Sequence, residues 1–182
     1  MPANSPSTSA ALEVHHTSVS DPAAEPLRAG LLDEYVTRYG DGAIEEMKRF
    51  PDALFTPEEG GAFLLLVENG VTVAGGAYKR YNAETAEFKR IWTHADHRRR
   101  GLARRVLTEL EDTARSRGYR RIFLTTGPKQ PEATGLYQAG GYHQEYGPDN
   151  SPGDFPHYAF TKDLNLELDL DLVLSEHDDG RV

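Results

Sequence analysis

The chain has 182 residues, 38% of them hydrophobic and 27% charged, which is typical of one globular domain with tails. Its 29 acidic and 20 basic residues give a net charge of −9, which argues against a general nucleic-acid-binding protein. The lack of cysteine excludes a disulfide framework, thiolate zinc sites and a cysteine nucleophile, and it fits a cytoplasmic protein. No apolar run is long enough to span a membrane.

The first half of the chain alternates between strand and helix signals. Residues 1–11, rich in Ser, Pro and Ala, are predicted to form a disordered leader. The Asn69-Gly70 pair between two apolar runs predicts a β-hairpin. The elements expected here are a strand over 12–18, helices over 22–39 and 43–50, and strands over 62–67, 71–78 and 85–93.

The second half opens with the clearest helix, which begins at Leu102 and ends before Gly118. Its apolar residues recur on one face. The elements that follow are a strand over 122–126, a helix over 131–139, and strands over 142–146 and 157–162. This order predicts an α+β domain over 12–163, built as a single mixed sheet flanked by helices.

Basic residues concentrate between the expected strand over 85–93 and the helix that begins at Leu102. Residues 86–129 hold 12 basic and 5 acidic residues, although the chain as a whole is acidic. Thr93 is followed by a short loop and then by Arg98-Arg99-Arg100-Gly101-Leu102-Ala103. The free N–H groups of a helix N-terminus and its dipole favour an anion such as pyrophosphate. The sequence therefore predicts an anion site in this loop.

The pattern R-x-x-G-x-A formed by Arg98, Gly101 and Ala103 resembles the coenzyme A loop of the GNAT superfamily of acyl-CoA-dependent N-acyltransferases. The resemblance covers about residues 87–142 and implies a mixed sheet splayed between its fourth and fifth strands, with pantetheine in the gap. It implies that acetyl-CoA is the co-substrate. The residues it assigns to acetyl-CoA are Ile91, Trp92, Thr93, Arg98, Arg99, Arg100, Gly101, Leu102, Ala103, Arg104 and Gln130.

A second stretch, 133–142, resembles the superfamily's A-x-x-L-Y-x-x-x-G-[FY] segment. The resemblance implies that Tyr137 is a catalytic acid that protonates the departing thiolate of coenzyme A. A phenol can donate a proton to a thiolate at modest cost, because their ordinary pKa values are about 10 and 8.5. Tyr142 is interpreted as a core aromatic. Gln130 stands where many members carry Asn, so the carboxamide is retained on a longer side chain.

Glu87 stands eleven residues before Arg98, the spacing at which some members carry a strand glutamate as general base. The alternative is a surface carboxylate paired with Lys89. Other candidates for the base are Glu34, Glu45 and Glu46 on the N-terminal helices.

The resemblance implies an N-acetyltransferase that moves an acetyl group from acetyl-CoA directly to a primary amine. A small-molecule acceptor is favoured over a protein, although protein lysines and N-termini stay open as acceptors. One alternative is a catalytically inactive acyl-CoA sensor. Another is a nucleic-acid-binding protein, disfavoured by the net charge and by the absence of aromatic residues among the arginines. The seven histidines form no metal-ligand spacing, so no metal is expected.

The end of the chain, 164–182, is an acidic extension in which Leu recurs at every second position from Leu164 to Leu174. Period two places these six leucines on one face of a strand. The extension is predicted to pair with a second subunit, giving a homodimer, or to fold back on its own domain; the alternative is a disordered acidic tail.

Overall fold

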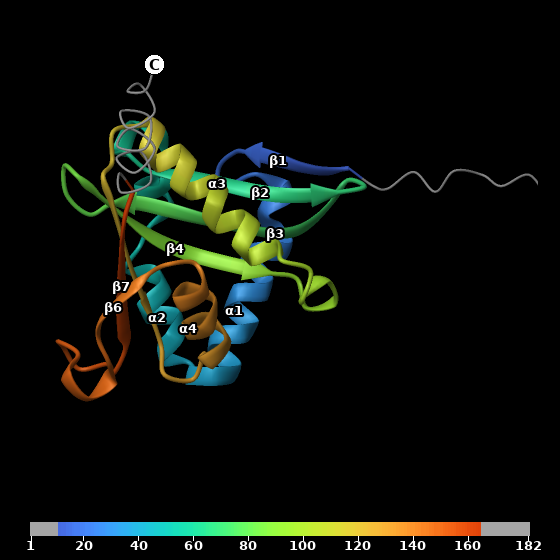
Figure 1. Ribbon diagram of the computed structural model, residues 1–182. Coiled ribbons are helices and arrows are strands. Elements are labelled where there is room, and N and C mark those ends of the chain that lie inside the picture. Colours follow the sequence, from blue (N-terminus) through green and yellow to red (C-terminus); the bar gives the residue numbers. More distant parts are fainter. Residues whose placement is uncertain (1–10, 165–182) are drawn as a thin grey trace, which may run out of the picture.

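Within residues 11–164, which are those the computed structural model describes, seven strands form one sheet with α-helices on both of its faces (Figure 1). The strands are β1 (Leu12–His16), β2 (Ala62–Glu68), β3 (Val71–Arg80), β4 (Thr85–Thr93), β5 (Arg121–Thr126), β6 (His143–Tyr146) and β7 (Tyr158–Asp163). The α-helices are α1 (Glu25–Tyr39), α2 (Gly42–Lys48), α3 (Leu102–Ser116) and α4 (Pro131–Ala139). The predicted α+β class is confirmed.

The strand order is β1-β2-β3-β4-β5-β7-β6, and β4 and β5 form the parallel pair between two antiparallel halves. Their pairing runs from Thr85 opposite Arg121 to Phe88 opposite Leu124 and then stops. Beyond that point β4 continues along β3, whereas β5 continues along β7. The sheet therefore splays between its fourth and fifth strands, as predicted.

Local signals account for several element boundaries. Asn69 and Gly70 both have positive φ, 52° and 76°, as the tight turn between β2 and β3 requires. The Asp21 carboxylate accepts a hydrogen bond from the Ala23 N–H at 2.8 Å, one turn ahead of α1. Gly40, with φ of 75°, ends α1, and Pro131 occupies the first position of α4.

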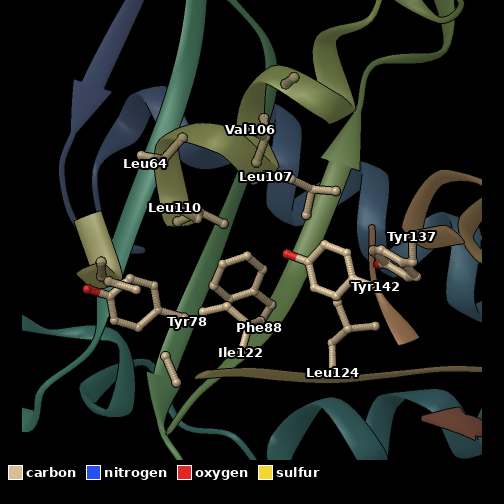
Figure 2. Close-up of a cluster of buried hydrophobic side chains, with 14 of the residues drawn as sticks. Leu64, Tyr78, Phe88, Val106, Leu107, Leu110, Ile122, Leu124, Tyr137 and Tyr142 are labelled. Carbon is tan, nitrogen blue, oxygen red and sulfur yellow. The ribbon is translucent and has the colours of Figure 1, made fainter. Parts of the chain in front are cut away.

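Two hydrophobic cores lie on opposite faces of the sheet. The larger core joins α3 and α4 to the sheet, and Figure 2 shows Val106, Leu107 and Leu110 of α3 among its members. The smaller core lies under α1. A Cβ at Gly75 would meet Leu27 of α1 at 2.6 Å, and one at Gly76 would meet Val106 of α3 at 2.8 Å. Glycine at both positions lets the two helices pack closely on β3.

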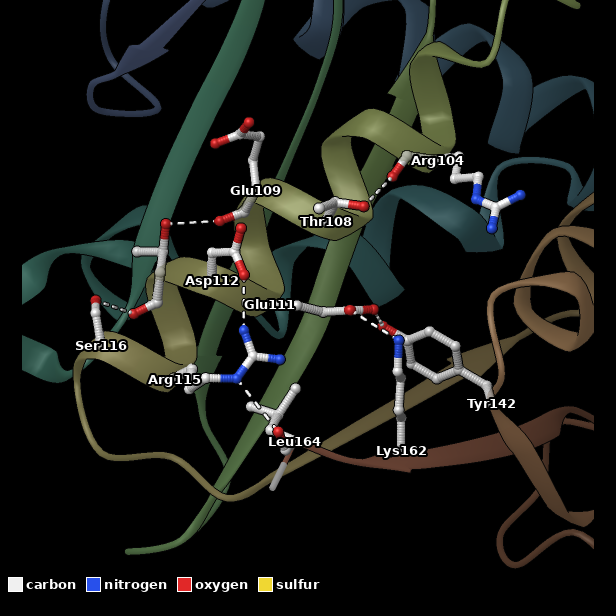
Figure 3. A network of polar contacts seen from close by, with 11 residues as sticks. Arg104, Thr108, Glu109, Glu111, Asp112, Arg115, Ser116, Tyr142, Lys162 and Leu164 are labelled. Atoms are coloured by element: carbon white, nitrogen blue, oxygen red, sulfur yellow. Dashed lines mark hydrogen bonds and ion pairs between the residues drawn. The ribbon is translucent and has the colours of Figure 1, made fainter. Parts of the chain in front are cut away.

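A buried polar network ties α3 to the C-terminal part of the fold (Figure 3). Glu111 of α3 accepts hydrogen bonds from the Tyr142 hydroxyl at 2.7 Å and from Lys162 Nζ at 2.9 Å. Every polar atom of this trio that is buried therefore has a partner. Tyr142 is a core aromatic, as the sequence predicts.

The described part of the chain ends at Leu164, which is 1% exposed and packs in the larger core. Its N–H donates to Arg120 O at 2.8 Å, and its carbonyl accepts from Arg115 Nε at 3.2 Å. The predicted leader, apart from Ala11, and the extension beyond Leu164 lie outside the described residues. Among the helices of residues 11–164, none has the length and apolar character needed to cross a membrane.

Candidate active site

A cavity of about 1280 Å³ lies where β4 and β5 separate. Both diverging strands contribute to its wall. The start of α3 and parts of α1, α2 and α4 complete it. The segment 152–157, between β6 and β7, covers the far end. Segments from the whole length of the domain therefore meet around one space, which has a basic end near α3 and an aromatic end near α2.

The basic end is formed by the loop that leads into α3. Arg99 and Gly101 both adopt positive φ, 62° and 75°, and Gly101 is the N-cap residue of the helix. No side chain caps the helix, so its first N–H groups are available to a ligand. A Cβ at Gly101 would meet no atom within 4 Å, so the space beside this residue is open. Glycine is needed here for the positive φ.

These features fit the pyrophosphate of coenzyme A, because an uncapped helix N-terminus and flanking arginines both favour anions. The residues predicted to bind the coenzyme that line this end of the cavity are Arg98, Arg99, Gly101, Leu102, Ala103, Arg104 and Gln130. The Gln130 side-chain oxygen accepts from Gly127 N at 3.4 Å, so it also closes the turn before α4.

The Arg100 side chain lies elsewhere. Its guanidinium makes a two-pronged ion pair with Glu68 at the end of β2, at 2.6 and 3.0 Å, and it is not part of the cavity wall. The Glu68 carboxylate raises the pKa of Arg100 further above its ordinary value, since the hydrogen bond and the charge both favour the guanidinium. The geometry therefore gives Arg100 a structural contact that fixes the loop.

A β-bulge shapes the wall on the β4 side. Gly75 pairs with Trp92 and Ala77 with Lys89, so β4 carries one extra residue here, and Arg90 adopts a positive φ of 59°. The Arg90 guanidinium holds this conformation by bonding Asp52 Oδ1 at 2.9 Å and Phe50 O at 3.0 Å.

Ile91 belongs to the bulge, and Trp92 and Thr93 follow it; all three line the cavity. The indole of Trp92 is buried under α1, so close to the helix that a Cβ at Gly30 would meet its Nε1. Thr93 Oγ1 is buried and has no hydrogen-bond partner within residues 11–164.

Tyr137 lies on α4 at the point where the cavity meets the larger core. Its ring packs against Tyr142 and Phe160, with centroids 5.8 and 5.6 Å away, and Figure 2 shows Tyr137 beside Tyr142. Burial, with a smaller contribution from Tyr35, raises the pKa of Tyr137 well above its ordinary value of 10.0. The phenol is therefore neutral at physiological pH and carries a proton that it can donate.

Glu87 lies on β4 before the bulge, on the sheet face that carries α1. It is 6% exposed and does not line the cavity. Its carboxylate binds Lys89 Nζ at 2.8 Å and Lys79 Nζ at 2.6 Å. Burial by itself raises the pKa of Glu87, but the two lysines outweigh it and hold that pKa below the ordinary value of 4.5. The structure thus separates Glu87 from Tyr137, and its role as a base stays a prediction.

The aromatic end of the cavity is walled by residues that sequence reasoning did not single out, namely Tyr35, Met47, Phe50, Phe55, Phe155 and His157. His157 Nδ1 lies 2.8 Å from the Phe155 carbonyl, so in the neutral ring that nitrogen carries the hydrogen. Its Nε2 lies 3.1 Å from the Tyr146 hydroxyl. No sequence motif marks this pair, because it forms only when residues 152–157 fold back over β6.

Of the other glutamates considered as bases, Glu34 and Glu46 line the cavity. Glu34 forms an ion pair with Arg38 at 2.9 Å, and Glu46 with Arg49 at 3.1 Å. Glu45 pairs with Lys48 at 2.7 Å outside the cavity wall. Within residues 11–164 no group of three His, Asp or Glu side chains is arranged to hold a metal ion.

The family model for the acetyltransferase (GNAT) family matches residues 25–142, which include α1, β4, the arginine loop and Tyr137. The chain belongs to the GNAT family. The uncharacterized N-acetyltransferase YsnE of Bacillus subtilis is 36% identical over 99 residues. This match spans 52% of the present chain and 65% of the relative's own length.

Solved structures show that the GNAT fold extends over most of this chain. An acetyltransferase of Streptococcus agalactiae is similar with a TM-score of 0.63 and 22% identity, over 83% of this chain and 97% of that one. A GNAT family acetyltransferase of Elizabethkingia anophelis, solved with acetyl-CoA bound, has a TM-score of 0.57 at 17% identity, over 84% of this chain and 97% of that one. At such identities the likeness concerns the fold.

Proposed function

We propose that the protein is an N-acetyltransferase that transfers the acetyl group of acetyl-CoA directly to a primary amine of a small molecule. One observation carries this proposal. A single cavity joins the anion-binding loop at Gly101 to the neutral phenol of Tyr137 and then to an aromatic end that suits an acceptor. Membership of the GNAT family and the acetyl-CoA bound by a protein of the same fold support it.

In this proposal acetyl-CoA supplies an activated acetyl group as a thioester. The N-terminus of α3, with Arg98 and Arg99, binds the pyrophosphate, and the wall formed by Ile91, Trp92 and Thr93 holds the acyl end. Holding two reactants together in one cavity accounts for much of the rate, since effective molarities can reach roughly 10⁵ M or more. With no cysteine in the chain to carry the acetyl group, direct transfer is the simplest route.

Two proton transfers complete the reaction. When the amine nitrogen bonds to the acetyl carbon and the C–S bond breaks, Tyr137 donates its hydroxyl proton to the departing sulfur. The nitrogen loses a proton to a base. Glu87 is the base that the sequence predicts, but His157 is favoured by its place on the cavity wall. Its Nε2 carries no hydrogen in the neutral ring, and it must exchange its contact with the Tyr146 hydroxyl for the amine proton.

The test is to incubate the purified protein with acetyl-CoA and a panel of primary amines while following the release of free thiol. Turnover with an amine, at a rate that depends on the concentrations of both substrates, is the expected result. Calorimetric binding of acetyl-CoA without turnover on any amine would favour the inactive sensor instead. Absence of both binding and turnover would overturn the proposal.

A further inference from the structure

A lysine pair shares a single carboxylate next to the aromatic end of the cavity. Lys79 on β3 and Lys89 on β4 bind the two oxygens of Glu87, at 2.6 and 2.8 Å. Their side chains are only 15% and 19% exposed. Both ammonium groups also lie over the ring of Phe50, with Nζ to centroid distances of 5.7 Å for Lys79 and 4.2 Å for Lys89.

The cluster Lys79–Glu87–Lys89 has two positive charges and one negative charge, so it carries an excess positive charge. Within residues 11–164, Glu87 is the one carboxylate that forms an ion pair with either lysine. Removing an ammonium group from water is costly unless a negative charge compensates it. The ring of Phe50 recovers part of that cost through cation–π contacts, but it supplies no negative charge. The cluster therefore has an excess positive charge that an anionic ligand would neutralise.

The place of the cluster decides what kind of anion can reach it. Lys89 and Phe50 both line the cavity, whereas Glu87 and Lys79 lie behind Lys89. The surrounding wall includes the apolar and aromatic side chains of Tyr35, Met47, Phe55 and Phe155. The nearby Arg90 guanidinium is already committed to Asp52 and to the Phe50 carbonyl. Arg49 also lines the cavity, 5.9 Å from the Phe155 ring centroid, but it is 63% exposed and paired with Glu46 at 3.1 Å. Lys89 is therefore the largely buried cation that this end of the cavity offers to a ligand.

We propose that the acceptor amine also carries a carboxylate, as an amino acid with an apolar side chain does, and that Lys89 binds this carboxylate. Glu87 and Lys79 act as positioning residues, because they hold the Lys89 ammonium at the wall. The apolar side chain of the acceptor packs on the aromatic lining. This inference rests on the proposed function and specifies the substrate class for the same site.

The inference is tested by binding, independently of catalysis. Isothermal titration calorimetry on the coenzyme A-saturated full-length protein compares the N-acetyl derivatives of phenylalanine, leucine and methionine with the corresponding N-acetyl amino amides. Each pair differs by a carboxylate against a neutral carboxamide. We expect at least one acid to bind about ten- to a hundredfold more tightly than its amide, as a charged hydrogen bond is typically worth.

Lys89→Met should reduce the affinity for the acid to that for the amide and leave the amide unchanged, whereas Lys89→Arg should keep the preference. Lys48→Met is the matched control, because Lys48 is an ion-paired lysine at the end of α2 that does not line the cavity. Melting curves identify any variant that fails to fold, and in that case the wild-type comparison of acids with amides decides by itself.

Equal binding of acid and amide, or binding of neither in all three pairs, would overturn the inference. Retention of the acid preference by a folded Lys89→Met protein would overturn it too. The proposed function fails separately, through the thiol-release assay. Acetylation of simple amines without a preference for acids would support the proposed function and overturn this inference. Preferential binding of the acids without acetyl transfer would support the inference and contradict the proposed function.

Discussion

Tyr137 and Tyr142 lie side by side in the larger core, yet their hydroxyl groups have different surroundings (Figure 2). The Tyr142 hydroxyl donates to Glu111, whereas that of Tyr137 bonds to no protein group within residues 11–164 and lies on the cavity wall. A buried hydroxyl with a charged partner contributes to stability, whereas one facing a cavity is free to serve a ligand. Replacing the tyrosine by phenylalanine should therefore affect catalysis at position 137 and stability at position 142.

Tyr137→Phe should lower kcat by roughly ten- to a thousandfold and leave acetyl-CoA affinity and melting temperature nearly unchanged, because only the proton donor is lost. Tyr142→Phe should instead lower the free energy of unfolding by about 1.5–3 kcal/mol with little effect on kcat. Steady-state kinetics and thermal melts on both variants check this. Unchanged turnover in Tyr137→Phe would show that thiolate release needs no acid from this residue.

The two candidate bases are separated by the pH dependence of kcat. If His157 accepts the proton, His157→Gln should lower kcat over the whole pH range, while Glu87→Gln should leave kcat nearly unchanged. A limb at or below pH 4.5 that disappears in Glu87→Gln would assign the base to Glu87, as the sequence predicts.

Glu87→Gln should also destabilise the protein, by roughly 3 kcal/mol at pH 7, since it leaves two partly buried lysines without a carboxylate. The pKa of Glu87 is lowered in the folded state, so its contribution is present above the ordinary value of 4.5 and is lost as pH falls through the folded-state value. The difference in melting temperature between wild type and Glu87→Gln should therefore shrink as the pH is lowered below 4.5. A difference that stays constant would show that the ion pairs contribute nothing.

At the scale of elements, α3 carries a glycine with positive φ at each end. Gly101 at its start and Gly118 beyond its end have φ of 75° and 88°, and a Cβ at either position would meet no atom within 4 Å. The two positions are matched in backbone conformation and in free space. They differ in that Gly101 lines the cavity and Gly118 does not.

Gly101→Glu and Gly118→Glu should therefore lower the melting temperature by similar amounts, since a left-handed conformation costs roughly 1–2 kcal/mol for a residue with a Cβ. Only Gly101→Glu should abolish acetyl-CoA binding, because it places a carboxylate at the N-terminus of α3. Calorimetric titration of acetyl-CoA into both variants measures the difference. Equal loss of affinity in the two would contradict the assignment of this loop.

For the molecule as a whole, the sequence predicts what local signals encode. The bounds of β4 and α4 match the expected 85–93 and 131–139, because Pro131 and the apolar runs mark them. Contacts between distant segments escape such reasoning. The partner of Arg100 is Glu68, 32 residues earlier, so a basic residue of the loop turned away from the cavity. The second lysine on Glu87 comes from β3, and its presence depends on the register with β4.

The acceptor end shows the same limit on a larger scale. Its wall combines α1, α2, the β4 bulge and residues 152–157, which meet only because the sheet splays. Periodicity and spacing predict each segment by itself, but not that Lys89 and His157 face one space. The coenzyme end is different, since the loop and the helix that follow β4 are contiguous in the chain. The residues that the sequence assigns to that end therefore line the cavity, with the exception of Arg100.

The burial of Leu164 determines how far the protein can be truncated from its C-terminus without loss of core contacts. A chain that stops at Asp163 loses a core leucine and its two backbone hydrogen bonds, and it should lose roughly 2–5 kcal/mol of stability. A chain that stops at Asn165 keeps Leu164 and both of these hydrogen bonds, so it should not show this loss. The longer truncation is thus the one suited to asking, by light scattering, whether the extension mediates a dimer. A change in mass on removing residues 166–182 would then report on association, free of damage to the core.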